Sequence, residues 1–119
     1  MKMKWILWLI VGLSTIISSP VLAQNAAPTA SVQSYLFGTG RMSCAKWLSH
    51  PEYERDGDQW ILGYWSGVNV LNPDNHLVGM NSDAEAIFGE VKKICRAEPS
   101  TTVNDATARI YYKFQQDGK

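Results

Sequence analysis

The first apolar segment of the chain lies close to its N-terminus. Lys2 and Lys4 precede an apolar run over residues 5–17, which is interrupted only by small or hydroxylated residues. This length is typical of the hydrophobic region of a signal peptide and is too short for a bilayer-spanning helix. Pro20 follows, and residues 21–23 place short side chains where signal peptidase cleaves. We therefore expect a signal peptide over residues 1–23, cleavage after Ala23 and export to the periplasm.

Residues 24–34 carry no charge and no periodic apolar pattern. Their Ala, Pro, Ser, Thr, Asn and Gln content predicts a flexible leader. Periodic apolar positions return near Tyr35, and the remaining length suits one hydrophobic core. The prediction is a single domain over residues 35–119.

The first half of this domain predicts two helices. Ser43 is suited to cap a short helix over 44–49, which places Cys44 on its buried face, and Pro51 would end it. The acidic residues 52–58 then suggest a loop, with Asp58 as the cap of a second helix over 59–71. That helix is apolar on nearly every side, which favours a central position.

The second half predicts two amphipathic helices. Ser82 and Glu85 form a capping-box pattern, in which each side chain reaches the other residue's backbone amide. The apolar stripe that follows brings Cys95 to the buried face, and Pro99 ends the helix. A last helix begins at Thr101 or Thr102 and frays into a polar tail. Its expected inward residues are Val103, Ala106, Ile110 and Phe114.

No segment alternates apolar and polar residues, so the pattern indicates an all-α fold, a small four-helix domain. Gly63 and Gly67 stand four residues apart on one face of the second helix. Each costs about 1 kcal/mol relative to Ala in a helix. The expected compensation is close approach of another helix at these two positions.

Cys44 and Cys95 are the only cysteines, and both follow the expected cleavage site. An even count in a short exported chain predicts a disulfide, and only one pairing exists. Closing a loop of about 52 residues disfavours the unfolded chain by roughly 4 kcal/mol. The bridge would join the first helix to the third.

Charge argues against some classes of partner. After signal cleavage 9 basic and 11 acidic residues remain, a net charge of −2 with histidines neutral. Nucleic acids and anionic lipids are bound by clustered Lys and Arg, and no such cluster is present. Neither is therefore an expected partner.

Catalytic patterns are weak. Ser66 lies in a Gly-rich stretch over 63–67 but stands one place too late for a G-x-S-x-G nucleophile elbow. A cysteine nucleophile needs a free thiolate, and the disulfide consumes both. His50 and His76 lack the spacing of a metal site, so we interpret them as solvated loop residues, with a weak contact of His76 and Asp74 to a metal as the alternative.

Carboxylate chemistry is also poorly supported. Residues 56–58 begin like a calcium-binding loop, but Gly67 occupies the twelfth position, where a glutamate belongs. The acidic residues 52–58 are explained more simply as a solvated loop than as paired glycosidase carboxylates. We predict no metal, no cofactor and no enzymatic activity.

Aromatic content is high for a domain of this size. Most of these side chains are expected in the core. Trp and Tyr also dominate protein–protein hot spots. Trp65 and Tyr112 are the two that we predict in a partner-binding surface.

Three segments carry a family resemblance: 44–47 (CAKW), 60–67 (WILGYWSG) and 94–99 (ICRAEP), followed by one amphipathic helix. Together they resemble the HdeA-like proteins and the related Rap/Tai-type immunity proteins of type VI secretion, from residue 42 to about 114. The resemblance implies a helical domain with a Cys44–Cys95 disulfide. It also implies a non-enzymatic role in binding other proteins.

Within that resemblance we favour an immunity protein that neutralises a type VI secretion toxin. The first alternative is an acid-stress periplasmic chaperone, and the second is a small envelope enzyme or enzyme inhibitor. No residue identifies a particular toxin, and the Trp-rich middle helix differs from the acid chaperone. The oligomeric state stays open, a dimer included.

Overall fold

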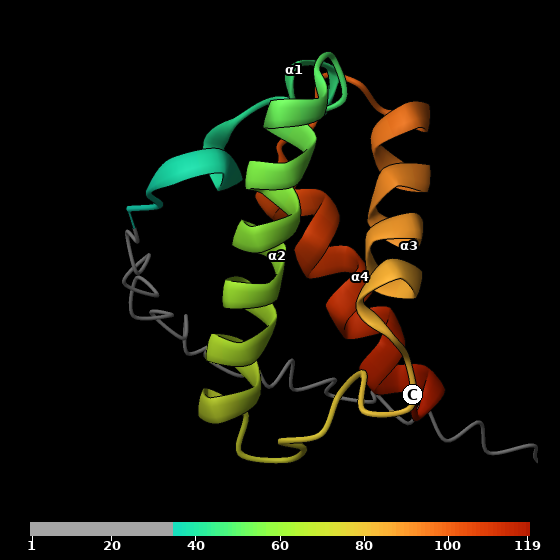
Figure 1. Cartoon of the computed structure of the whole chain (residues 1–119). Coiled ribbons are helices and arrows are strands. Elements are labelled where there is room, and N and C mark those ends of the chain that lie inside the picture. Colours follow the sequence, from blue (N-terminus) through green and yellow to red (C-terminus); the bar gives the residue numbers. More distant parts are fainter. Residues whose placement is uncertain (1–34) are drawn as a thin grey trace, which may run out of the picture. The chain divides into compact units, whose positions relative to one another are not determined.

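The computed structural model describes residues 35–119, and all the described elements are helical (Figure 1). They are η1 (Gly38–Arg41), α1 (Cys44–Trp47), α2 (Pro51–Leu71), α3 (Ala84–Ala97) and α4 (Val103–Asp117). The all-α prediction is confirmed for this part of the chain. The predicted signal peptide and leader lie outside the described residues.

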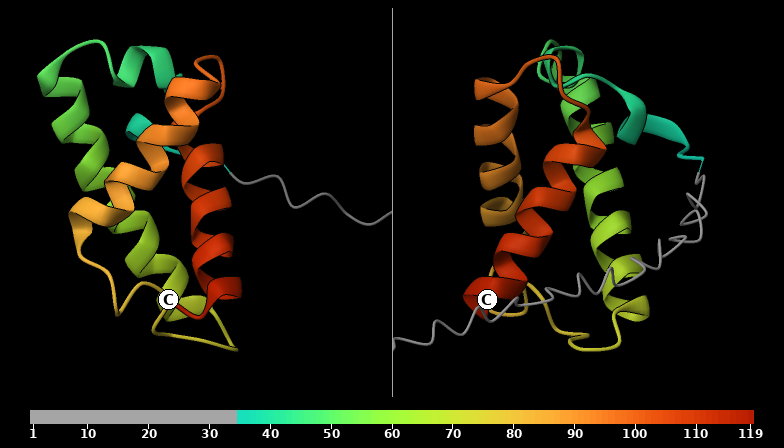
Figure 2. Two further views of the ribbon diagram at one scale, coloured as in Figure 1. Left: turned by 90° about the vertical axis from the view of Figure 1, so that its right-hand side faces the viewer. Right: turned by 180° about the vertical axis from the view of Figure 1, so that it is seen from behind.

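The three long helices form the body of the domain. α2 and α3 stand side by side in Figure 1, and α4 packs behind them. α1 lies at one end of this bundle, and the loop between α2 and α3 closes the other (Figures 1 and 2). Among residues 35–119, β-type pairing is limited to one isolated antiparallel bridge between Ser43 and Thr102.

The predicted inward faces of α3 and α4 are confirmed. Periodic apolar positions on both helices enter one core with α1 and α2, and burial of such side chains drives the packing. The fully buried large residues include Trp47, Ile61, Val91, Val103 and Tyr111.

The disulfide Cys44–Cys95 is also confirmed. It joins α1 to α3 with a Cα–Cα distance of 4.8 Å, and both residues are at most 1% exposed. The bridge therefore lies within the core, at the α1 end of the bundle.

The predicted start of α2 is wrong. The helix begins at Pro51 and runs through 52–58, so that these residues are not a loop and Asp58 is not a cap. Proline is favoured in the first turn, where its missing N–H costs nothing, and Glu52 and Glu54 there suit the positive end of the helix dipole. Local signals therefore support the earlier start.

The acidic turn forms ion pairs with α3. Lys92 Nζ lies 3.1 Å from Glu54 Oε2 and 3.7 Å from Asp58 Oδ1. Burial raises the pKa of Asp58, and Lys92 opposes that effect. The acidic residues that suggested a solvated loop thus connect two helices.

The glycine prediction is wrong as well. A Cβ at Gly63 or Gly67 would meet no atom within 4 Å, because this face of α2 is open. Close approach occurs elsewhere. A Cβ at Gly57 would lie 2.0 Å from Trp47 Nε1, and one at Gly40 would lie 2.2 Å from Trp60 Cζ2. These two glycines let indole rings from α1 and α2 pack against backbone.

The observed caps of α3 and α4 agree to different degrees with the caps predicted from the sequence. Asp83, not Ser82, caps α3, and its side chain accepts a hydrogen bond from the amide of Ala86 at 2.7 Å. The predicted cap is therefore wrong by one residue, because Asp caps a helix as well as Ser does. Thr102, one of the two predicted starting residues, caps α4 and accepts from the amide of Asp105 at 3.1 Å.

Candidate partner-binding surface

The two aromatic residues predicted in a partner-binding surface lie in different environments. Trp65 is only 5% exposed, packs edge-on against Tyr111 and Phe114, and donates from Nε1 to the carbonyl of Val78 at 2.7 Å. It is a core residue, so its predicted role is wrong. Tyr112 is 60% exposed on α4. Its role in binding stays a prediction.

Other apolar side chains are exposed near the same end of the bundle. Val70 and Leu71 end α2, and Leu77 and Met80 lie in the α2–α3 loop. With Tyr112 they are 59% to 82% exposed. We call these five residues the loop-end surface. The segments that carry it meet at the lower end of the domain in Figure 1.

The part of this surface that α2 and the α2–α3 loop supply is nearly free of charge. Between Asp58 and Asp83 the sequence contains a single Asp, Lys, Glu or Arg residue, Asp74. Protein interfaces lose charged residues and gain aromatic residues and Met at their centre. The composition of the loop-end surface matches that pattern.

The loop is fixed by hydrogen bonds to α2 and to the C-terminal residue. The carbonyl of Val78 accepts from Trp65 Nε1 and also from Asn69 Nδ2, at 2.7 and 3.1 Å. The amide of Gly79 donates to the carbonyl of Lys119 at 2.9 Å. Asn69 O also lies 2.8 Å from His76 Nδ1. Leu77 and Met80 are therefore displayed on an anchored backbone.

A polar network secures the junction of α2 and α4. Asn72 is buried, donates to Tyr111 Oη at 3.0 Å, and accepts through Oδ1 from the amides of Asp74 and Asn75. Tyr111 Oη in turn donates to Asn69 Oδ1 at 2.8 Å. Each polar group has a partner, which makes this buried network favourable.

Beside the network lies a groove of about 340 Å³ between α2 and α4. Val68, Leu71 and Tyr112 line it together with Pro73. Tyr64 lies further along α2, and burial and the neighbouring Tyr112 raise its phenol pKa. The groove is thus open to solvent and partly apolar.

The residues weighed for catalysis do not form a constellation. Ser66 is exposed on α2. His50 Nδ1 contacts Ser49 Oγ at 2.9 Å beside α1, whereas His76 contacts the backbone of Asn69 at the other end. In residues 35–119, no three His, Cys, Asp or Glu side chains gather in a group that could hold a metal ion.

Comparison with known proteins provides no identification: no protein-family model, curated protein or solved structure matches the chain. Over the described residues, no helix combines the length and the apolar character needed to cross a membrane.

Proposed function

We propose that this protein is a non-enzymatic binding module that recognises another folded protein through the loop-end surface. The observation that carries the proposal is the exposure of five large apolar side chains at the anchored loop end of the bundle, four of them within residues 59–82, a segment with one charged residue. Singly exposed apolar side chains are common, whereas several at one end of a small domain, here beside two grooves, are typical of an interaction site.

The anchoring supports one specific partner. A surface that is already ordered loses little conformational entropy on binding. More of the free energy gained by burying apolar side chains therefore contributes to affinity. Binding many unfolded clients is served better by mobile, repacking surfaces. Together with the sequence resemblance, this favours an immunity protein whose partner is a type VI secretion toxin in the periplasm.

The ionisable groups give little support to an acid-activated alternative. The hydrogen bond from Arg109 lowers the pKa of Glu98, and that from Lys113 lowers the pKa of Asp117. Both are exposed pairs, which contribute little to stability. Asp58 has a raised pKa, so that its protonation favours the folded state. None of these three groups therefore provides a strong acid-triggered opening, which an acid-activated chaperone requires.

Affinity capture of the purified, oxidised protein at pH 7, followed by calorimetry with the captured partner, tests the proposal. We expect one stoichiometric partner. The double substitution Leu71→Ser and Met80→Ser should weaken its binding by about tenfold or more, because two apolar anchors are lost. The double substitution Gln59→Ser and Arg96→Ser is the control, since both side chains are exposed and lie outside the loop-end surface.

Two results would contradict the proposal. The first is equal loss of binding in the control variant. The second is strong protection of an acid-denatured client at pH 2–3, absent at pH 7, without any partner at neutral pH. That outcome would support the chaperone alternative.

A further inference from the structure

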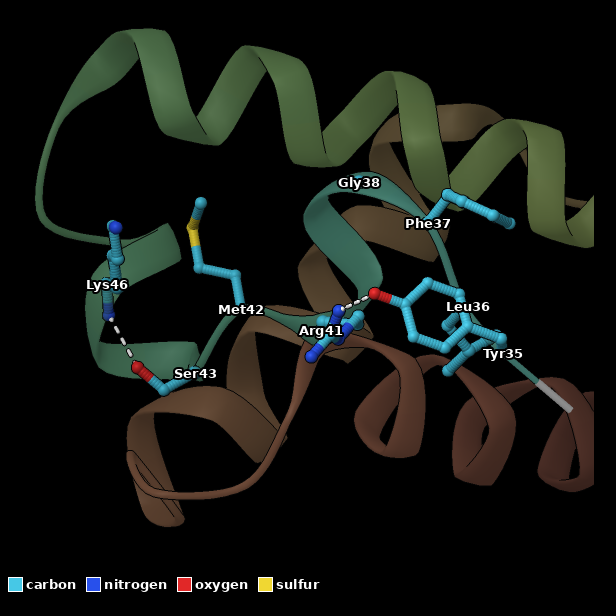
Figure 3. Close-up of a pocket in the computed structure, with 8 residues that line it drawn as sticks. All are labelled: Tyr35, Leu36, Phe37, Gly38, Arg41, Met42, Ser43 and Lys46. Carbon is cyan, nitrogen blue, oxygen red and sulfur yellow. Dashed lines mark hydrogen bonds between the residues drawn. The ribbon is translucent and has the colours of Figure 1, made fainter. Parts of the chain in front are cut away.

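A second groove lies along η1 and α1, and Figure 3 shows the side chains that line it. Its volume is about 470 Å³. Tyr35, Phe37 and Met42 supply apolar surface, and Arg41 and Lys46 are its charged residues. Tyr35 and Phe37 are 67% and 77% exposed. Aromatic and cationic groups thus meet in one open groove.

The backbone of this groove is held in place from two sides. On one side, Gly40 packs against the ring of Trp60, whose Nε1 donates to the carbonyl of Phe37 at 3.0 Å. On the other side, the carbonyl of Met42 accepts from the amide of Val103 at 3.0 Å. The groove is therefore built by contacts to α2 and α4.

The two cations have no carboxylate partner among the described residues. The ion pairs of this region of the chain use other cations: Lys92, Lys93, Arg109 and Lys113. Arg41 instead lies over the ring of Tyr35, with its carbon Cζ 4.9 Å from the ring centre, and donates to the Tyr35 hydroxyl (Figure 3). This contact orients the guanidinium while most of its five N–H donors remain available.

Lys46 supplies the second charge. Its ammonium group is 5.7 Å from the ring centre of Tyr53, and the residue is exposed. No Asp or Glu lines the groove. A ligand that brings carboxylates would therefore meet uncompensated positive charge, although the protein as a whole is slightly acidic after the expected cleavage.

We propose that the η1–α1 groove binds an acidic peptide segment of another protein, one that carries an aromatic side chain between carboxylates. Arg41 and Lys46 bind the carboxylates, and the aromatic side chain packs against Phe37 and Met42. A peptide is favoured over a small carboxylic acid because the groove is open and its lining extends from Tyr35 to Lys46. Binding energy must then come from several contacts spread along its length.

This site is separate from the loop-end surface. α1 lies at the opposite end of the bundle from the α2–α3 loop (Figures 1 and 2). Both surfaces can therefore be occupied at once, and loss of one should leave the other intact. Failure of the present proposal is distinguishable from failure of the proposed function.

Titration of the full-length mature protein with a capped hexapeptide tests the proposal. The probe carries glutamates on both sides of one phenylalanine, and its partner peptide has glutamines instead. Backbone NMR shifts should move in residues 35–46 with the acidic probe only. Arg41→Gln with Lys46→Gln should weaken binding by about tenfold or more, because charge-assisted hydrogen bonds are lost.

Arg55→Gln with Arg96→Gln is the matched control. It removes the same charge at two exposed positions outside the groove and should leave binding unchanged. Circular dichroism establishes that both double variants fold. Equal binding of the glutamine peptide, equal loss in the control, or no shift in residues 35–46 would overturn the proposal. Equal binding of phenylacetate alone would also overturn it, since the site would then recognise a small acid.

Discussion

The contact between Gly57 and Trp47 allows a test in which one substitution has opposite effects at two places in α2. Gly→Ala in a helix interior ordinarily stabilises by about 1 kcal/mol, because Ala loses less backbone entropy on folding. Gly63→Ala should show that gain, since its new methyl group meets no atom within 4 Å. Gly57→Ala carries the same gain in propensity but adds a steric conflict.

The conflict at Gly57 is severe because the indole ring has no room to move. The added carbon would lie 2.0 Å from Nε1 and 2.4 Å from Cδ1 of Trp47. Trp47 is 0% exposed, its Nε1 donates to the carbonyl of Glu54 at 3.1 Å, and Lys92 Nζ lies 5.6 Å from the ring centre. Overpacking of this kind costs about 1–3 kcal/mol or more.

The propensity gain cancels between the two variants, so their difference measures the steric cost alone. We expect Gly57→Ala to be less stable than Gly63→Ala by about 1–3 kcal/mol or more. In a domain of this size, each kcal/mol of lost stability lowers Tm by about 4–8 °C. Thermal melting and guanidinium unfolding of the oxidised proteins provide the comparison. Equal Tm values for the two variants would refute the packing of Trp47 on α2.

Three further outcomes follow. Cys44 and Cys95 should not react with thiol reagents until the protein unfolds, and reactive thiols in the native protein would contradict this. Replacing both by Ala should lower the free energy of unfolding by roughly 4 kcal/mol, as guanidinium unfolding can measure. Asn69→Ala should accelerate amide exchange in residues 75–82, because the loop loses its hydrogen bond to Val78, and unchanged exchange would count against the anchoring. Asp58→Asn should stabilise at neutral pH, and the gain should shrink as pH falls through the raised folded pKa towards 3.8, as urea titrations at several pH values can measure. A stability gain that grows as the pH falls would contradict the raised pKa of Asp58.

The features predicted correctly are those that depend on periodicity. The apolar stripes of α3 and α4 and the burial of Cys95 need only the 3.6-residue repeat and a core to face. The all-α class and the disulfide follow from the same stripes and from the cysteine count. No distant contact has to be known for any of them.

Most of the features that were missed depend on tertiary partners. The earlier start of α2 is the exception, because Pro51, Glu52 and Glu54 are local signals for it. Only the ion pairs of Lys92 with Glu54 and Asp58 required the fold to be known. The need for glycine at 57 appears only when the ring of Trp47 is placed against it. Periodicity identified glycines in α2 that could mediate packing. It could not identify which glycine has a neighbour, because that depends on the position of another helix.

The binding surface shows the same limit. Trp65 and Tyr112 are both aromatic residues on helices, and their exposure depends on how α2 and α4 are rotated in the bundle. The loop between α2 and α3 contains no regular element, so its order was not evident from the sequence. Side-chain amides provide that order, and Asn69 is the residue whose role could have been suspected, because it interrupts an apolar helix end.

The disulfide has a consequence for proteolysis. Cys44 and Cys95 are 51 positions apart, and the bridge converts everything between them into a covalent ring. That ring contains all of α2, the α2–α3 loop and most of α3. A protease that cuts once inside the ring leaves one molecule of unchanged mass apart from an added water, and the fragments separate only after reduction. Four of the five residues of the loop-end surface thus stay covalently attached to the core through a single cleavage.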